Sequence, residues 1–356
     1  MNKYLLNKES RNVKNHVIHE LQSWNLTHKS KLTFFGKLYH YFVPLVLPAK
    51  RLDYWLCWRR GLLAKSILYY NPCEKDYEII ADYFDEYIKK KGCVIELENI
   101  YNGEAILLLY NFYKKKSYEK IIISYIDFLL KVPKDIEGSI PYFNNKTDIL
   151  VDGLMCTPFI FMSLKYYQRN RELEIIGYKQ IMNFIKRGFD DKTGLPYHAY
   201  NSDDCMQKGI YGWGRGVGWF LSSVVISLEY MEKNNDYYSA ILQKFIETVK
   251  DSIGYQLETG LFTWCLLTPH GPIDTSTTCM ILYSVAKGIN LGILPAAFIA
   301  NVQKGRDSLC FYIRDGRLYQ AMADCGGLSV YPQEKYGNYP WSDGFLLLLD
   351  SEIDKF

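Results

Sequence analysis

The sequence lacks the cysteine and histidine patterns that mark a disulfide-bonded or zinc-binding protein. Its nine cysteines, an odd number, are scattered through 356 residues without one CxxC pair, and its six histidines form no HExxH motif. Scattered, unpaired cysteines fit reduced thiols better than a disulfide framework, and zinc sites need grouped Cys or His ligands. We therefore expect a cytoplasmic protein that uses no metal and no other cofactor.

Long apolar runs are also missing. The first residues, MNKYLLNKESRNVK, contain neither the apolar core nor the cleavage site of a secretory signal. The most apolar early stretch, 34–49, is interrupted by Lys37, His40 and two prolines, and it is too short to cross a bilayer. Four basic residues follow it: Lys50, Arg51, Arg59 and Arg60. They would allow this segment to contact an anionic membrane surface weakly. The alternative is an arm that packs on the protein.

No strong excess of one charge calls for a nucleic-acid partner. The net charge is +3, but residues 1–60 hold eleven Lys and Arg against three acids, so the remainder is slightly acidic. The 31 tyrosines suit a wet, partly aromatic cleft. The overall charge therefore gives no reason to expect a DNA or RNA partner.

Sustained alternation of β-branched and polar residues is absent too, and helical spacing takes its place. Eleven helices are predicted, at 53–70, 74–91, 100–114, 118–131, 153–169, 171–187, 216–233, 236–252, 277–291, 295–313 and 343–353. Short links of two or three residues alternate with long ones, at 132–151, 188–214, 254–275 and 314–342. Hairpins joined in this way stack into a ring with every long link at one end. We expect an all-α (α/α)6 barrel at 51–356 and a basic arm at 1–50.

Polar and aromatic clusters stand where the predicted inner helices begin. They are Glu98/Asn99, Asp152, Trp213/Arg215, Asp274/Ser276 and Ser342/Asp343. Each could be a plain helix cap, and Asp152 alone would be read that way. Five clusters in one register at one mouth of a barrel point instead to a binding site.

The string Gly-Trp-Gly-Arg-Gly-Val-Gly-Trp, residues 212–219, is the most specific. It lacks the preceding strand and the later acid of a dinucleotide-binding loop. Its glycines would let backbone and ligand approach closely. Trp213 and Trp219 offer flat faces for a sugar ring, and Arg215 offers a planar fork for a carboxylate. The alternative role of Arg215 is a salt bridge inside the barrel.

Four strings in order resemble the unsaturated glucuronyl/rhamnogalacturonyl hydrolases, glycoside hydrolase families 88 and 105, of which this chain looks like a divergent member. They are VDGLMCTPFIFMSLKYY, LPYHAY, GWGRGVGW and DTSTTCMILYSVAKGINLGIL, and the likeness spans about residues 95–350. The resemblance implies an (α/α)6 barrel that hydrolyses oligosaccharides ending in a 4,5-unsaturated uronic acid.

The resemblance also assigns roles. Asp152 is similar to the family's catalytic acid and base, with Glu98 the candidate second carboxylate. His198, Trp213, Arg215 and Trp219 are similar to pocket residues. Trp341 and Asp343 stand in a Gly-rich segment of the family and are also expected to bind substrate. The chain departs from the usual pattern where Glu98 and Asn99 replace an Asp pair, at Leu150, and where Pro141-Tyr142 replaces a His-Lys pair, unless Lys146 takes over that role.

Two other functions remain open at this point. A different glycosidase on the same barrel would need two carboxylates, about 5 Å apart for retention or about 6.5–9.5 Å apart for inversion. Asp152 with Glu98, Asp204 or Asp343 could supply them. The third reading is a non-catalytic sugar-binding protein of polysaccharide assembly.

Overall fold

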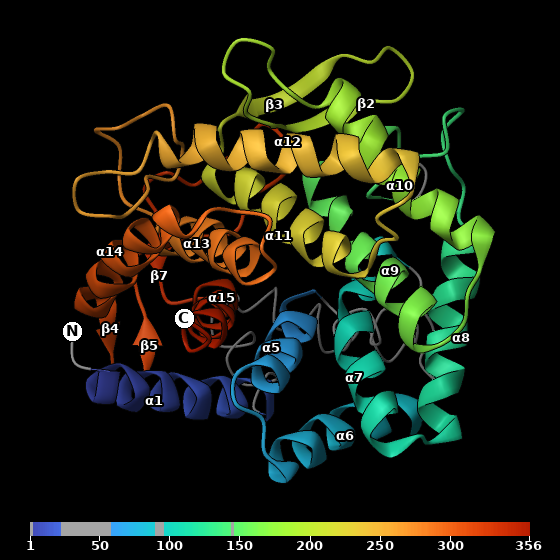
Figure 1. Ribbon diagram of the computed structural model, residues 1–356, viewed down its shortest axis with the longest axis horizontal. Helices are drawn as coiled ribbons and strands as arrows, with labels where there is room; N and C mark the ends of the chain where they lie inside the picture. Colours follow the sequence, from blue (N-terminus) through green and yellow to red (C-terminus); the bar gives the residue numbers. More distant parts are fainter. Residues whose placement is uncertain (1–2, 23–57, 90–95, 144–145) are drawn as a thin grey trace, which may run out of the picture.

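The computed structural model describes residues 3–22, 58–89, 96–143 and 146–356. Six helices form an inner ring: α5 (Trp58–Tyr69), α7 (Gly103–Tyr113), α9 (Cys156–Tyr166), α11 (Gly214–Tyr230), α13 (Thr275–Asn290) and α15 (Pro340–Ile353). Each packs against the next, and α15 closes on α5. Six lie outside them: α1 (Lys3–Gln22), α6 (Glu74–Lys89), α8 (Lys116–Lys131), α10 (Arg171–Arg187), α12 (Asp236–Ile253) and α14 (Ile299–Leu309). Figure 1 shows this double ring, the predicted (α/α)6 barrel.

Burial explains which helices lie inside. Residues 275–288 of α13 are buried on every side, as are residues 341–352 of α15. A helix that is apolar all round has to be covered all round. The outer helix α12 instead buries a stripe, Tyr238, Ile241, Phe245 and Val249, at helical spacing. Each fully buried Leu, Ile or Phe favours folding by about 1.5–3 kcal/mol.

Each of the eleven predicted helices is present, so the fold prediction is confirmed; residues 53–57 and 90–91 of those ranges lie outside the described residues. Helix α1 was not predicted. It buries Val13, Val17 and Leu21 against α15 and α5, and it occupies the outer position of the sixth helix pair. The boundary at residue 50 stays a prediction, because residues 23–57 lie outside the described part of the chain.

Two of the four basic residues of the predicted membrane-contact segment contact other parts of the protein. Arg60 is buried, donates to the Leu21 carbonyl oxygen and lies over the Tyr83 ring. Arg59 forms an ion pair with Asp324. Lys50 and Arg51 lie outside the described residues. Within the described ranges, no helix combines the length and apolarity needed to cross a membrane.

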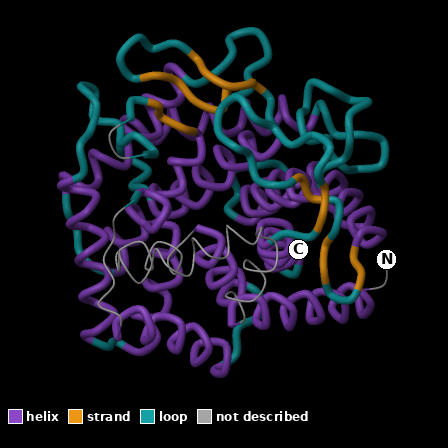
Figure 2. The backbone as a smooth tube through the Cα atoms, turned by 180° about the vertical axis from the view of Figure 1, so that it is seen from behind, coloured by secondary structure: helices purple, strands orange, loops and turns teal. Residues whose placement is uncertain are grey.

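Short strands, which were not predicted, form in the long links. Strands β1 (Asp148–Leu150), β2 (Tyr197–Asn201) and β3 (Gln207–Tyr211) make an antiparallel sheet in which Asp148 faces Asn201. Two ribbons pair β4 (Ile313–Arg314) with β5 (Arg317–Leu318) and β6 (Ala321–Met322) with β7 (Tyr336–Gly337). The chain also forms 3-10 helices, η1 (Leu97–Asn102), η2 (Val151–Met155), η3 (Ala296–Phe298) and η4 (Cys310–Tyr312). In Figure 2 the three-stranded sheet and the loops beside it cover one side of the helices.

The glycines of the 212–219 string allow close helix packing. A Cβ at Gly214 would lie 2.4 Å from the Thr277 side chain, and one at Gly218 would lie 2.5 Å from Met280. Both neighbours belong to α13, so these two glycines bring α11 against α13. This differs from the interpretation that they admit a ligand, because the space that a Cβ would fill is taken by protein.

The seven cysteines within the described ranges are all free thiols. Three of them, Cys156, Cys265 and Cys279, are buried, and burial raises the pKa of each thiol. These three are packing residues more than reactive ones. The cytoplasmic location stays a prediction.

Candidate active site

A cleft of about 400 Å³ opens where the inner helices begin. Among the residues that the structure describes, the following line it: Trp58, Arg59, Glu98, Tyr142, Phe143, Lys146, Asp148, Leu150, Asp152, His198, Trp213, Arg215, Trp219, Asp324, Cys325, Gly327 and Leu328. Six of the eight predicted site residues are therefore brought together. The two that do not line it are Trp341 and Asp343. The size is that of a site for a small ligand or a short piece of a larger one.

Asp152 is not a helix cap. It lies in the turn η2 ahead of α9, and neither helix start carries a side-chain cap hydrogen bond. Its Oδ2 atom is buried and accepts no hydrogen bond from the described residues. That oxygen stands 3.3 Å from His198 Nε2, within ion-pair distance. A carboxylate oxygen held at a cleft wall without a donor is suited to receive one from a ligand or water.

His198 is oriented by a residue that the sequence did not reveal. Its Nδ1 atom lies 2.7 Å from the Tyr331 hydroxyl, which already accepts from the Ile210 amide at 3.3 Å. Burial raises the Tyr331 pKa, so the hydroxyl keeps its proton. We infer that this proton is donated to Nδ1, which leaves the ring proton of a neutral His198 on Nε2, facing Asp152.

Trp213 stacks beside this pair. Its ring centroid is 4.3 Å from that of His198, and it packs at 5.8 Å from Tyr331. Its indole Nε1 is buried without a hydrogen-bond partner among the described residues. A buried indole N–H normally finds an acceptor, so this donor of a cleft-lining residue is unsatisfied within the described part of the chain. Trp219 is 3% exposed and meets Trp58 edge to face at 5.4 Å.

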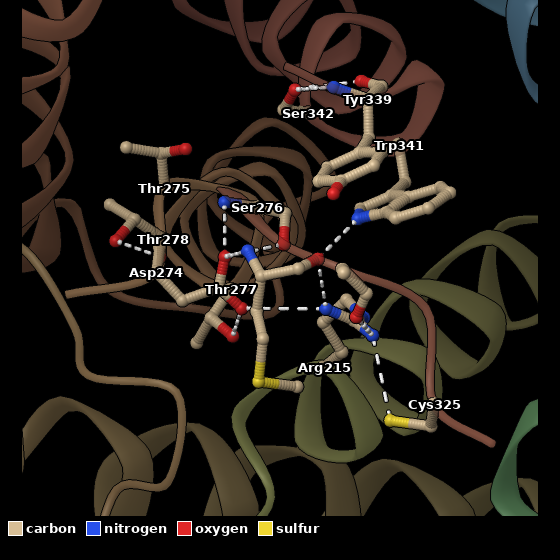
Figure 3. A network of polar contacts seen from close by, with 12 residues as sticks. Arg215, Asp274, Thr275, Ser276, Thr277, Thr278, Cys325, Tyr339, Trp341 and Ser342 are labelled. Atoms are coloured by element: carbon tan, nitrogen blue, oxygen red, sulfur yellow. Dashed lines mark hydrogen bonds and ion pairs between the residues drawn. The ribbon is translucent and has the colours of Figure 1, made fainter. Parts of the chain in front are cut away.

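Arg215 lies at the cleft wall, but its fork is occupied. Nη1 donates to the Met322 carbonyl oxygen at 2.8 Å and Nη2 to that of Ala323 at 3.0 Å. Nη1 is also 3.8 Å from Asp274 Oδ2. Figure 3 shows the guanidinium between this aspartate and Cys325, with Trp341 beside it. Arg215 thus lies in a buried ion pair, as the alternative role predicts, and it also lines the cleft; its binding of a carboxylate stays a prediction.

Glu98 and Asn99, which stand where the resemblance predicts a pair of acids, lie in different surroundings. Glu98 lines the cleft. Asn99 is buried, and its side chain accepts from the Glu96 amide at 3.1 Å in the turn η1. Tyr142 and Leu150, the other two departures, also line the cleft. The changed residues thus alter the cleft wall while Glu98 keeps one carboxylate there.

Trp341 packs against Arg215, which lines the cleft, but does not line the cleft itself. Its Nε1 donates to the Met322 carbonyl oxygen at 3.1 Å, its ring stacks on Tyr339 at 4.6 Å, and the Arg215 guanidinium lies 5.5 Å from its ring centroid. It therefore holds the β6 segment and Arg215 in place.

Asp343 faces the barrel's outer side. Oδ1 accepts from the Leu318 amide at 2.8 Å, Oδ2 accepts from Asn338 at 2.7 Å, and Oδ2 is 3.6 Å from His16 on α1. Its predicted place in the substrate pocket is not where the structure puts it, because its carboxylate fastens α15 to β5 and α1. Asp204 lies in the turn between β2 and β3 and does not line the cleft either.

Burial of Asp343 predicts a pH dependence of stability. Burial raises its pKa to about 7, so the folded protein holds a proton that the unfolded chain releases near pH 4. Stability from this group is complete below about pH 4 and is lost as the pH rises through about 7. Relative to wild type, Asp343→Asn should gain up to about 4 kcal/mol in the free energy of unfolding between pH 4 and pH 8. Urea unfolding of both proteins at each pH measures this difference in the free energy of unfolding.

The exposed Asp236→Asn variant is the matched control and should show no such trend. His16 has its pKa lowered to about 4, chiefly by burial, and acts in the opposite direction by losing stability as the pH falls below about 6.5. The Asp343→Asn variant keeps His16, so the difference between the two proteins reports on the carboxyl group. A difference that stays constant with pH would contradict the assignment.

Comparison with known proteins places this barrel and its cleft among the glycoside hydrolases, enzymes that cleave O-glycosyl bonds. The chain belongs to Glycosyl Hydrolase Family 88, whose model matches residues 34–356. The resemblance drawn from the four strings is thereby confirmed. A non-catalytic sugar-binding protein is no longer the reading that fits, since the family is one of hydrolases.

Solved structures share the fold at low identity. A possible member of glycoside hydrolase family 105 from Klebsiella pneumoniae aligns with a TM-score of 0.84 at 16% identity, covering 100% of this chain and 95% of that one. Another from Salmonella enterica aligns at 0.78 and 18%, covering 85% of each chain. An unsaturated glucuronyl hydrolase from Bacillus sp. GL1, responsible for glycosaminoglycan degradation, aligns at 0.68 and 14%, covering 84% of this chain and 86% of that one.

Proposed function

We propose that this hydrolase removes a terminal 4,5-unsaturated uronic acid from oligosaccharides; the Bacillus relative is named an unsaturated glucuronyl hydrolase. The observation that carries the proposal is the pair of unused polar atoms in the cleft. Asp152 Oδ2 offers an acceptor and Trp213 Nε1 offers a donor, and both are buried. Together with the nearby rings, they suit a sugar ring that presents hydroxyl and carboxylate groups.

The unsaturated uronate is an enol ether, which makes it reactive toward acid. The Asp152 carboxyl group gives its proton to C4, and positive charge develops at C5 and the ring oxygen. Water then forms a bond to C5 as the resulting Asp152 carboxylate takes a proton from it. The hemiketal so formed opens to a ketone at C5 and a hemiacetal at C1. The hemiacetal then collapses to an aldehyde and releases the neighbouring sugar as an alcohol. His198 Nε2 lies 3.3 Å from Asp152 Oδ2, within ion-pair distance, so the imidazole stands beside the carboxyl group through these steps.

Substrate orientation would come from the cleft walls. The Trp213 ring supplies a flat apolar surface, and its indole N–H donates to a sugar oxygen. Positive charge for the uronate carboxylate comes from the side chains of Arg59, Lys146 and Arg215, which all line the cleft. Because the Arg215 fork already binds backbone oxygens, its contribution would be charge at the wall more than a two-pronged contact.

A conventional glycosidase with two carboxylates is the second candidate, and Glu98 favours it because it lines the same cleft as Asp152. Such an enzyme would cleave sugars that carry no double bond. The enol-ether mechanism requires the double bond, so substrate choice separates the two.

The test compares a matched pair of oligosaccharides, one ending in an unsaturated uronic acid and one in the corresponding saturated acid. We expect the ultraviolet absorbance of the enol ether to disappear with the first and no product to form from the second. Cleavage of both at similar rates would favour the two-carboxylate enzyme. Cleavage of neither would contradict the proposed substrate class.

A further inference from the structure

A buried ion pair joins two helices of the inner ring, and neither partner is among the described residues that line the cleft. Lys65 lies on α5 and Glu104 on α7, and the Lys65 ammonium is 2.7 Å from Glu104 Oε1. Both side chains are only 2% exposed. The Tyr69 hydroxyl donates to Glu104 Oε2 at 3.4 Å. The pair therefore ties α5 to α7, which are neighbours in the ring (Figure 1).

The ion pair connects the elements that carry three residues of the cleft wall. Trp58 and Arg59 lie on α5, and Lys65 follows Trp58 by about two helical turns, so the two side chains leave the same side of the helix. Glu98 lies in the turn η1, which runs directly into α7 ahead of Glu104. All three wall residues line the cleft. A shift of α5 along α7 would therefore move two of them relative to the third.

Two further contacts hold η1 on α5 and lead to a fourth wall residue. The Lys65 ammonium lies 4.3 Å from the centroid of the Tyr101 ring. A Cβ at Gly61 would lie 2.9 Å from the Tyr101 carbonyl carbon, so the backbones of α5 and η1 are in contact. The Tyr101 ring meets Trp219 edge to face at 5.7 Å, and Trp219 meets Trp58 at 5.4 Å. One aromatic ring thus separates the buried cation from Trp219.

A buried ion pair is suited to fixing position more than to adding stability. The free energy needed to take two charges out of water offsets much of their attraction, and apolar residues of similar volume are often as stable or more so. The pair adds direction, because an ammonium group has to meet a carboxylate oxygen at hydrogen-bond distance. Apolar contacts between helices are less specific about register, which is the best-supported role of buried polar pairs.

We propose that Lys65 and Glu104 are positioning residues for the hydrolysis, and that they set how the wall residues of α5, η1 and α11 face one another across the cleft. This rests on the proposed function. Asp152 and His198 lie on other elements, η2 and β2. Loss of the pair therefore alters how the substrate is held more than it alters the proton transfers.

The experiment replaces both charges together, because a single change would leave the other charge buried and unpaired. Lys65→Met with Glu104→Leu should fold, with an unfolding temperature within roughly 3 °C of the wild-type value. We expect its KM for an unsaturated uronyl disaccharide to rise by about 10-fold, since a misplacement of about 1 Å can cost up to about 100-fold. Its kcat should change by less than about 2-fold. A smaller folded fraction alone would lower kcat and leave KM unchanged.

A second measurement needs no substrate. Trp58 and Trp219 are in contact, and near-ultraviolet circular dichroism reports on the packing of such rings. The near-ultraviolet spectrum of the double variant should differ from that of wild type while the far-ultraviolet spectrum stays the same. If wild type hydrolyses no unsaturated oligosaccharide, the proposed function fails, and this spectrum still tests whether the pair places the two indoles.

Lys287→Met with Glu229→Leu is the matched control. Lys287 is buried, lies 2.6 Å from Glu229 Oε2 and joins two inner helices, α13 and α11, in their last turns. Neither residue is among those described as lining the cleft. This variant should keep the wild-type KM and near-ultraviolet spectrum. An unchanged spectrum in the Lys65 and Glu104 variant, an unchanged KM where wild type is active, or equal changes in both double variants overturns the proposal.

Tyr101→Leu provides the test if the Lys65 and Glu104 double variant does not fold. It removes the ring between Lys65 and Trp219 and keeps the ion pair. The same rise in KM and the same spectral change are expected, and wild-type values of both would overturn the proposal.

Discussion

Replacing Asp152 by Asn is expected to abolish hydrolysis and leave the fold intact. Asn keeps the size of the side chain but neither donates a proton to C4 nor takes one from water. General acid–base catalysis contributes about 10²–10⁴-fold, and Asp152 is proposed to do both steps, so kcat should fall by about 10³-fold or more. Oδ2 accepts no hydrogen bond from the described residues, and stability should change by less than about 1 kcal/mol. The rate at which the ultraviolet absorbance is lost measures kcat, and thermal unfolding measures stability.

Asp148 offers a matched control within the same cleft. Its carboxylate is already engaged, with Oδ1 2.8 Å from Lys208 Nζ and 3.1 Å from Asn201. Asp148→Asn should therefore lower kcat far less than Asp152→Asn. Glu98→Gln distinguishes the mechanisms: a loss comparable to that of Asp152→Asn is expected of a two-carboxylate enzyme and a smaller one of the enol-ether route. Activity retained in Asp152→Asn would remove that residue from the mechanism.

The sequence predicted which helix ends would lie together at one mouth of the barrel, because the lengths of the links alone decide that arrangement. Short links turn a helix back at once, and the long links then share one end of the ring. Asp152 and Trp213 lie far apart in the chain, and the barrel brings them to one cleft. Trp58 and Arg59 also line the cleft, but they lie inside the helix predicted at 53–70, so the rule about helix starts did not select them.

What the sequence could not show is how each side chain is engaged. Tyr331 meets His198 across 133 residues from a loop without a periodic pattern. The Arg215 fork is filled by carbonyl oxygens of Met322 and Ala323, and backbone acceptors leave no mark on composition. Asp343 shares the register of the other clusters, yet its carboxylate turns to Leu318 and Asn338. Position along a helix was predictable here, whereas side-chain direction and partner depend on tertiary packing.

Asp274 supports the wall of the cleft, and its replacement by Ala should have the largest effect on stability. The carboxylate is fully buried. Oδ1 accepts from the Ser276 amide at 3.0 Å, from its hydroxyl at 2.6 Å and from the Met322 amide at 3.1 Å. Oδ2 accepts from Thr277 at 2.9 Å and lies 3.8 Å from Arg215 Nη1. One side chain therefore caps α13, holds β6 and offsets a buried cation (Figure 3).

Removal of one partner of a buried ion pair costs about 3–5 kcal/mol, whereas loss of an ordinary helix cap costs about 1 kcal/mol. For 356 residues, Asp274→Ala should thus lower the unfolding temperature by roughly 4–7 °C. Asn235→Ala, at the cap of α12 where the side chain accepts only from the Tyr237 amide at 3.0 Å in the described structure, should lower it by a few degrees at most. Asp274→Asn keeps acceptor capacity without the charge and should fall between them. Equal unfolding temperatures for Asp274→Ala and Asn235→Ala would show that Asp274 is no more than a cap and that Arg215 does not depend on it.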